Sequence, residues 1–194
     1  FDDTINKIAE SFGKLEGDPV AHPELPKEEP MTGITTKEVY GPTAESVSVA
    51  FRAAAKGTEE HKLLTMADMI LANGNAGLID LNLNQKQVVQ NAGCSPTFLK
   101  DFSFHQFTGT PKADQSLDEV KDHLLAQIDA LKKGEFEDWM LEAVINDLKL
   151  NQTRQYENST ALANAYVNAF IYHQTWEDEV KFLDDLKKIT KEQV

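Results

Sequence analysis

The chain has 194 residues, 41% of them hydrophobic, and carries 32 acidic against 19 basic side chains, for a net charge of −13. This size and composition suffice for a buried core, while the acidic balance argues against nucleic-acid binding, which needs clustered Lys and Arg. The single cysteine, Cys94, excludes an internal disulfide and a zinc site built from several thiolates, and no run of about 18 apolar residues could span a membrane.

The chain is expected to begin with a helix and a linker. Apolar residues at helical spacing, closed by Gly13, predict a helix within residues 1–15. Residues 16–32 contain four prolines and are expected to form an extended linker. We expect residues 33–194 to form the main domain, and the whole chain to be one structural domain cut from a longer polypeptide.

Strand and helix signals alternate in the first part of the main domain. Gly33–Tyr40 is a candidate short edge strand, and Ser46–Phe51 alternates like a half-buried strand. Thr58 is a plausible N-cap for a helix over Glu59–Ala72. After a Gly-rich turn, Leu78–Leu83 is expected to form one or two helical turns. Gln85–Gly93, carrying Val88 and Val89, and then Phe102–Thr110 are expected to be strands.

The second half of the chain reads as consecutive helices. Ser116 and Glu119 form a capping box for Ser116–Lys133, and Gly134 ends that helix. Three further helical runs follow with short connections, and Thr175 and Asp178 mark the start of the last. Their expected buried stripes are Phe136, Trp139, Met140, Val144 and Leu148, then Leu162, Tyr166, Val167 and Phe170, then Trp176, Val180, Leu183, Leu186 and Ile189.

In this order, and with the phrase Lys133-Gly134-Glu135-Phe136 at the hinge of the helix pair, the chain resembles the non-catalytic half of a pitrilysin/insulinase-type zinc metallopeptidase. The resemblance implies an α+β fold, a half-unit sandwich like that of the processing peptidases, with a mostly antiparallel sheet and helices packed on one face. It also implies that two or four such domains enclose a peptide in a chamber.

The zinc motif of that family is incomplete in this sequence. The family binds zinc with an inverted H-x-x-E-H helix, in which both imidazoles face the metal and the Glu activates the bound water. The nearest match is Gly57-Thr58-Glu59-Glu60-His61, where glycine stands in place of the first histidine. We therefore expect no catalytic residue, no metal ligand and no cofactor in this chain, and we expect His61 to be an exposed residue. Zinc is implied for the catalytic domain of the parent protein.

The family's substrate-binding Arg–Tyr pair is also missing. By resemblance, Asn84 stands where the Arg would be, and Gln90 or Asn91 stands where the Tyr would be. The candidate chamber-lining or domain-interface residues are Leu78, Asn84, Gln90, Asn91, Phe104 and His105. Apolar residues around Leu78–Leu83 and Phe102–Phe107 are expected to be exposed in the isolated chain. Cys94 is expected to be structural or incidental, and His105 is otherwise expected to be a surface or packing residue.

Two functions fit these observations. The first is a scaffold and chamber domain of a zinc-dependent peptidase, inactive by itself, whose partners are the neighbouring catalytic domain of the same polypeptide and, in the whole enzyme, a peptide substrate. The alternative is a catalytically dead structural or peptide-binding relative of the same fold. An H-x-x-E-H helix in the sequence before Phe1 would favour the first.

Overall fold

The computed structural model describes residues 1–17, 26 and 29–194, and it divides into two compact units, Phe1–Gly41 and Pro42–Val194. The first unit holds helix α1 (Asp2–Phe12), in which no residue is buried: Ile5 and Ile8 are about half exposed and Phe12 is 65% exposed. Most of the proline-rich linker expected at 16–32 lies outside the described residues. The range 33–40 is neither helix nor strand, so the edge strand expected there was wrong.

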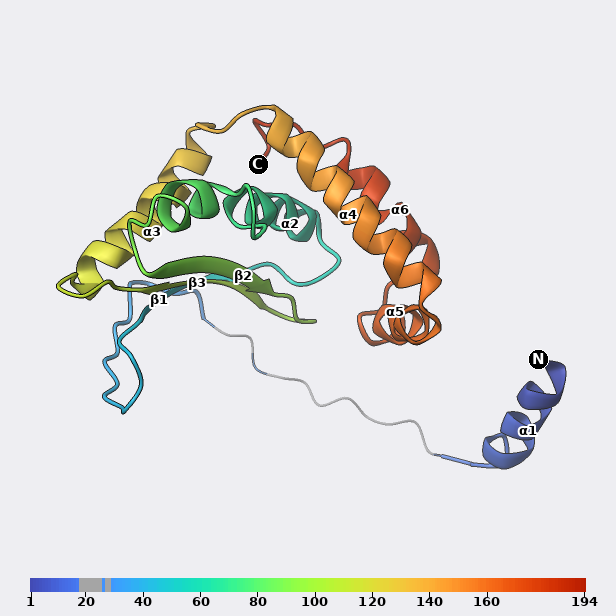
Figure 1. Cartoon of the computed structure of the whole chain (residues 1–194). Coiled ribbons are helices and arrows are strands. Elements are labelled where there is room, and N and C mark those ends of the chain that lie inside the picture. The colour runs from blue at the N-terminus through green and yellow to red at the C-terminus, as the bar shows by residue number, and fades with distance from the viewer. Residues whose placement is uncertain (18–25, 27–28) are drawn as a thin grey trace. The chain divides into compact units, whose positions relative to one another are not determined.

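The second unit is built on a three-stranded antiparallel sheet (Figure 1). Its strands are β1 (Val47–Ala53), β2 (Asn91–Thr97) and β3 (Ser103–Thr110), in the order β1-β3-β2. The strand predicted over Gln85–Gly93 begins only at Asn91, because Val88 and Val89 lie in the turn that follows a helix. Val89 is nevertheless buried in the core, which explains its apolar character.

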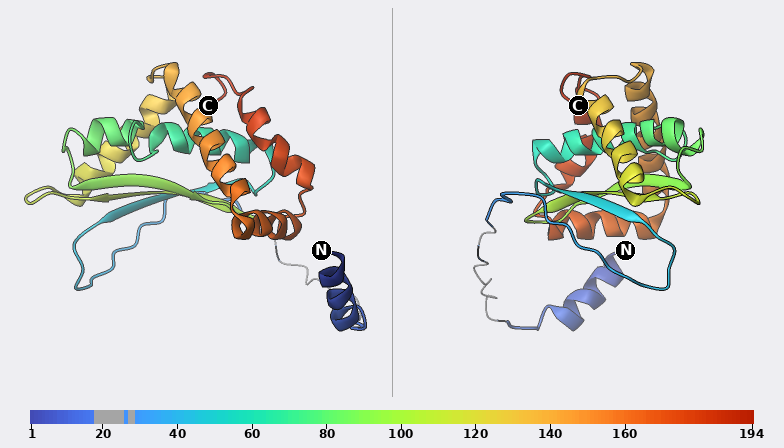
Figure 2. Two further views of the ribbon diagram at one scale, coloured as in Figure 1. Left: turned by 45° about the vertical axis from the view of Figure 1, so that its right-hand side comes forward. Right: turned by 90° about the vertical axis from the view of Figure 1, so that its left-hand side faces the viewer.

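One face of this sheet is covered by helices (Figure 2), as predicted. They are α2 (Glu59–Leu71), the short π-helix η1 (Asp80–Asn84) and α3 (Leu117–Lys132). Thr58 caps α2 by accepting the backbone N–H of His61, and the predicted capping box of Ser116 and Glu119 begins α3. The core between these layers includes Met66, Ile70, Ile79, Leu83, Phe107, Val120 and Leu124.

Helix α3 approaches β3 closely because Gly109 has no side chain. An added Cβ at Gly109 would lie 2.4 Å from Cγ1 of Val120 and 3.3 Å from Cδ1 of Leu124. Both of those side chains are fully buried. The residue opposite Gly109 on β2 is the small Ala92. The distance between helix and sheet at this point is therefore set by a missing side chain.

Three further helices complete the unit: α4 (Trp139–Glu157), α5 (Ser159–Ile171) and α6 (Trp176–Leu186). Gly134 ends the preceding helix segment with φ of +67°, as its predicted role requires. The buried stripe predicted for α5 was wrong, because α5 buries the small Ala165 and Ala169 and leaves Phe170 83% exposed. Small residues let α5 pack closely against its neighbours, while Tyr166 and Val167 are about half exposed. Trp139 is likewise 52% exposed, although a buried position was expected.

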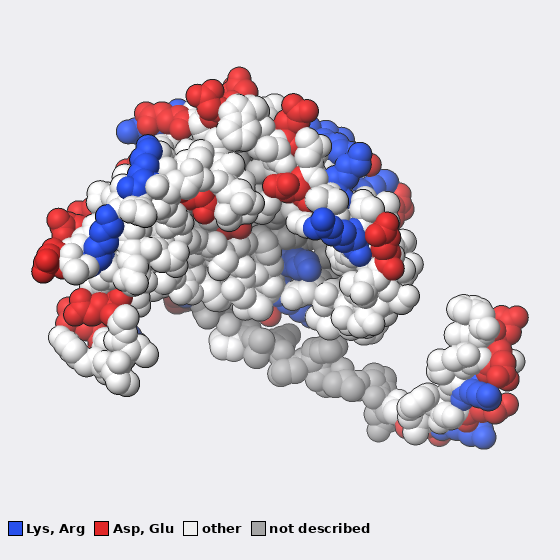
Figure 3. All heavy atoms as spheres, in the orientation of Figure 1, with Lys and Arg blue, Asp and Glu red and all other residues white. Residues whose placement is uncertain are grey.

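The last helix returns to the first helix of the unit. Lys62 of α2 donates to Asp185 of α6 over 2.9 Å, and Phe182 of α6 stacks on His61 of α2. On the side shown in Figure 3, acidic and basic side chains are interspersed over the helices. Within the described part of the chain, no helix combines the length and apolar character needed to cross a bilayer.

Candidate functional site

The incomplete zinc motif lies at the start of α2, where Gly57 has φ of +93° and Thr58 is the N-cap. His61 was expected to be exposed, and this expectation was wrong: only 6% of the residue is exposed. Its ring meets Phe98 edge-on, with centroids 4.2 Å apart, and stacks on Phe182 at 5.1 Å. The His61 side chain is thus part of an aromatic cluster that joins α2, α6 and the segment before β3.

One ring nitrogen of His61 also takes part in a hydrogen bond that belongs to the fold. Nδ1 accepts the backbone N–H of Gly57 over 3.3 Å. Burial, together with the nearby positive charges of Lys56 and Lys62, lowers the pKa of His61 to about 4. The imidazole is therefore neutral at pH 7. With glycine in place of the first histidine and this ring enclosed between Phe98 and Phe182, these residues do not fit the zinc ion that the family motif binds.

Asn84, which stands where the family has its Arg, has a structural role. Its Nδ2 donates to the backbone oxygen of Ala92 and its Oδ1 accepts the Ala92 N–H, both over 2.8 Å. The side-chain amide thus pairs with β2 as a neighbouring strand would. Gln90 and Asn91 are exposed at the start of the same strand. The structure does not bring these residues together into a charged substrate clamp.

Phe104 and His105 lie on opposite faces of β3, because neighbouring strand residues point in opposite directions. His105 is on the helix-covered face and only 5% exposed. Phe104 is on the other face, which we call the open sheet face. Its members follow from the strand register: Ser48, Ala50, Arg52, Asn91, Gly93, Ser95, Thr97, Phe104, Gln106, Thr108 and Thr110.

The open sheet face is polar and almost uncharged. Gln106 donates to Ser48 across the β1–β3 pair over 2.8 Å. Arg52, the one charged residue of this face, lies with its guanidinium 5.9 Å from the ring centre of Phe102, which is 44% exposed. Phe107, on β3, is 2% exposed, so the exposure expected for Phe102–Phe107 holds only for part of that range.

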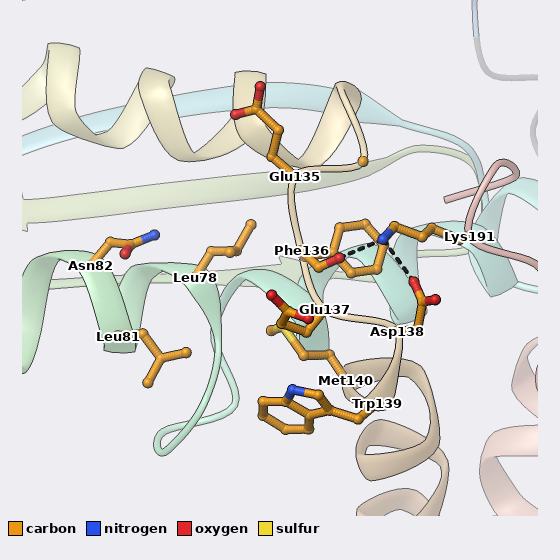
Figure 4. Close-up of a pocket in the computed structure, with 11 residues that line it drawn as sticks. Leu78, Leu81, Asn82, Glu135, Phe136, Glu137, Asp138, Trp139, Met140 and Lys191 are labelled. Carbon is orange, nitrogen blue, oxygen red and sulfur yellow. Dashed lines mark hydrogen bonds and ion pairs between the residues drawn. The ribbon is translucent and has the colours of Figure 1, made fainter.

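A groove of about 700 Å³ lies between η1 and the turn that joins α3 to α4 (Figure 4). Leu78 and Leu81 line one side, and residues 134–140 with Lys191 line the other. Lys191 donates to the backbone oxygen of Phe136 and to Asp138, and its ammonium lies 4.7 Å from the centre of the Phe136 ring. Of the expected exposed stretch Leu78–Leu83, Leu78, Ile79 and Leu83 are buried, which corrects that prediction.

A cluster that the sequence did not reveal joins α2 to two strands. Asp68 Oδ1 lies 2.8 Å from Nε2 of His105 and accepts the thiol of Cys94 over 3.3 Å. The three residues are far apart in the sequence and come from three elements, so no local spacing could have predicted their meeting. Burial raises the pKa of the Cys94 thiol, and the Asp68 carboxylate raises it further. Cys94 is therefore no activated nucleophile.

Comparison with known proteins agrees with this geometry. Residues 2–148 match the family model of the peptidase M16 inactive domain. The chain matches no curated protein sequence closely enough to identify a relative. The resemblance to pitrilysin/insulinase-type metallopeptidases and the fold class inferred from it are both confirmed.

Three solved structures illustrate the fold. A protease from Helicobacter pylori superimposes with a TM-score of 0.71 at 15% identity, covering 76% of this chain and 36% of that protein. An inactive peptidase domain from Bordetella parapertussis gives 0.66 at 16% identity, with 78% and 83% covered. The periplasmic protease PqqL from Escherichia coli gives 0.67 at 18% identity, with 99% and 22% covered. The chain thus spans about a third or less of the two full proteases.

Proposed function

This chain belongs to the family of peptidase M16 inactive domains, and from that membership we propose that it is the non-catalytic chamber domain of a zinc-dependent peptidase. It would support a catalytic domain of the same polypeptide and help to enclose the peptide that the catalytic domain cleaves. The zinc would be bound by that catalytic domain. The residues Gly57 to His61 would hold none.

The observation that carries this proposal is that the His61 ring is buried and hydrogen-bonded. A catalytic zinc site needs two imidazoles and keeps one coordination position open to water. Here the first histidine position is Gly57, and the ring of His61 is packed between Phe98 and Phe182 with Nδ1 accepting a backbone N–H. In this chain the matching residues lie at the start of α2, where His61 packs against Phe182 of α6.

The open sheet face is the part of the domain that we assign to the chamber wall. It carries hydroxyl and amide groups and the partly buried ring of Phe104, with Arg52 as its charge. Such neutral hydrogen-bonding groups can contact the backbone of an extended peptide without selecting its side chains. Asn91, at the edge of this face, and the exposed Gln90 beside it fit the same role.

The proposal is tested with fluorogenic peptides. The purified chain should give no chelator-sensitive cleavage, with or without added zinc. A catalytic domain from the same polypeptide, carrying the H-x-x-E-H helix and supplied separately, should bind the chain, and its cleavage rate should rise at least tenfold on binding. Chelator-sensitive cleavage by the purified chain alone would refute the proposal.

Two matched variants locate the chamber wall. Ala50 on the open sheet face and Ala126 on α3 are both exposed. Ala50→Arg should lower cleavage by the combined domains several-fold for lysine-rich peptides, because it adds a positive charge to the wall. Ala126→Arg should leave the rate unchanged. Equal effects of both changes would contradict the assignment of this face. Binding of the two domains without any gain in cleavage would favour the structural alternative.

A further inference from the structure

Three side chains with metal-binding atoms meet between α2 and the sheet. Asp68 comes from the last turn of α2, Cys94 from β2 and His105 from β3. The carboxylate oxygen, the sulfur and the ring nitrogen all lie within 4.8 Å of one another. Cys94 pairs with Phe107 in the sheet and Pro96 pairs with His105, so Cys94 and His105 are diagonal neighbours on one face.

The position of this cluster is unusual for polar residues. The side chains of His105 and Asp68 are only 7% and 13% exposed, and the His105 ring contacts the core residue Phe107. Burial of such groups is costly unless each has a partner. In the structure one oxygen, Asp68 Oδ1, contacts both the Cys94 thiol and the His105 ring. The catalytic motif does not include these residues, and His61 lies about 10 Å away along α2, two helical turns earlier.

We propose that Asp68, Cys94 and His105 bind one divalent cation of the zinc class. Zinc takes sulfur, imidazole nitrogen and carboxylate oxygen at about 2.0–2.3 Å, and sites with three protein ligands complete the tetrahedron with water. Ligand atoms in such a tetrahedron are about 3.3–3.7 Å apart. The 2.8 Å between Asp68 and His105 and the 3.3 Å between Asp68 and Cys94 need to widen by roughly half an ångström or less. The separation of Cys94 Sγ from His105 Nε2, which is within 4.8 Å, has to reach the same range through side-chain rotation.

Charge balance favours the same ligand set. Binding would release the thiol proton of Cys94 to solvent, and His105 would coordinate through Nε2 with its remaining proton on Nδ1. The thiolate and the Asp68 carboxylate then neutralise the two charges of the cation. Cys94 and Asp68 are partly exposed, so a cation and a water ligand would reach the cluster from the solvent side of these two residues. The cation would tie α2 to β2 and β3.

The single cysteine makes the test specific. Co²⁺ bound to a thiolate gives a charge-transfer band in the near ultraviolet, and Cys94 is the only thiol in the chain. Titration of the reduced, chelator-treated protein with Co²⁺ should give this band with one equivalent, and Zn²⁺ should abolish it by displacement. At a hundredfold excess of Zn²⁺ over its dissociation constant, the melting temperature should rise by at least about 5 °C.

Variants separate this site from unspecific binding. Cys94→Ser should remove the band, and Asp68→Asn, which keeps the side-chain volume, should weaken Co²⁺ binding at least tenfold. His123→Ala, on α3, should change neither. The Co²⁺ titration of the parent protein decides the proposal even if a variant fails to fold. If no charge-transfer band appears at millimolar Co²⁺, the cluster is only a hydrogen-bonded network and the proposal is wrong. A rise in melting temperature that is equal in the parent and in Asp68→Asn would also refute it.

Discussion

Replacing Gly109 by alanine tests whether the missing side chain sets the distance between α3 and the sheet. The backbone of Gly109 is in a conformation that alanine adopts freely, so the cost is steric. The new methyl group would lie 2.4 Å from Cγ1 of Val120, which is fully buried and belongs to the core. Overpacking of this kind costs about 1–3 kcal/mol. For a domain of this size the melting temperature should fall by about 3–10 °C.

The assay is thermal or urea unfolding followed by circular dichroism, with Gly93→Ala as the matched control. Gly93 is on the adjacent strand but on the open sheet face, where an added Cβ meets no atom within 4 Å. Gly93→Ala should leave stability unchanged or raise it by up to about 1 kcal/mol, through the unfolded chain.

A double variant identifies the clashing atom. Val120→Ala removes Cγ1, so Gly109→Ala combined with Val120→Ala should be more stable than the sum of the single effects predicts, by about 1–2 kcal/mol. If the two changes are additive, or if Gly109→Ala and Gly93→Ala are equally harmless, the close approach of α3 at Gly109 does not limit the packing and the reasoning fails.

Three further changes probe other parts of the domain. Gly134→Val should destabilise it by about 1–2 kcal/mol because Gly134 has φ of +67°. Gly134→Asn should destabilise it less. Equal melting temperatures for the parent and the valine variant would contradict the helix boundary. Asn84→Ala should cost about 1–3 kcal/mol because it leaves the buried N–H and C=O of Ala92 without their partner, a loss that urea unfolding can measure. The pKa of His61 falls from 6.5 to about 4 on folding, so its contribution to stability is complete above pH 6.5 and is lost as the pH falls from 6.5 towards 4. The parent should therefore lose stability relative to His61→Gln across that window, and parallel pH profiles would exclude a buried, neutral His61.

Local signals predicted the parts of the fold that local interactions determine. The capping box of Ser116 and Glu119 and the end of α3 at Gly134 depend on residues within one turn, and both were predicted correctly. The assignment of β3 residues to two faces was also predicted correctly, because the side chains of a strand alternate between the covered and the open face. The fold class followed from the order of these elements and from the resemblance they carried.

The errors concern residues whose environment comes from distant parts of the chain. His61 is buried because Phe182, on the last helix, stacks on it, and no residue close to His61 in the sequence predicts that contact. On α5, hydrophobicity favoured Phe170 for the core, but close helix packing selected Ala165 and Ala169 instead. The meeting of Asp68 with His105 likewise depends on how α2 crosses the sheet, which no sequence spacing encodes.

The contact between α2 and α6 has a consequence for biosynthesis. Lys62 and Asp185 are 123 residues apart, and at about 5–20 residues per second the ribosome needs roughly 6–25 s to make the chain between them. Once β3 has been made, the sheet and α2 can form, but until α6 follows the His61 ring lacks its stacking contact with Phe182. The domain can therefore complete its folding only after its last helix has been synthesised. A nascent or truncated chain without α6 leaves Phe98 and His61 exposed to chaperones and proteases.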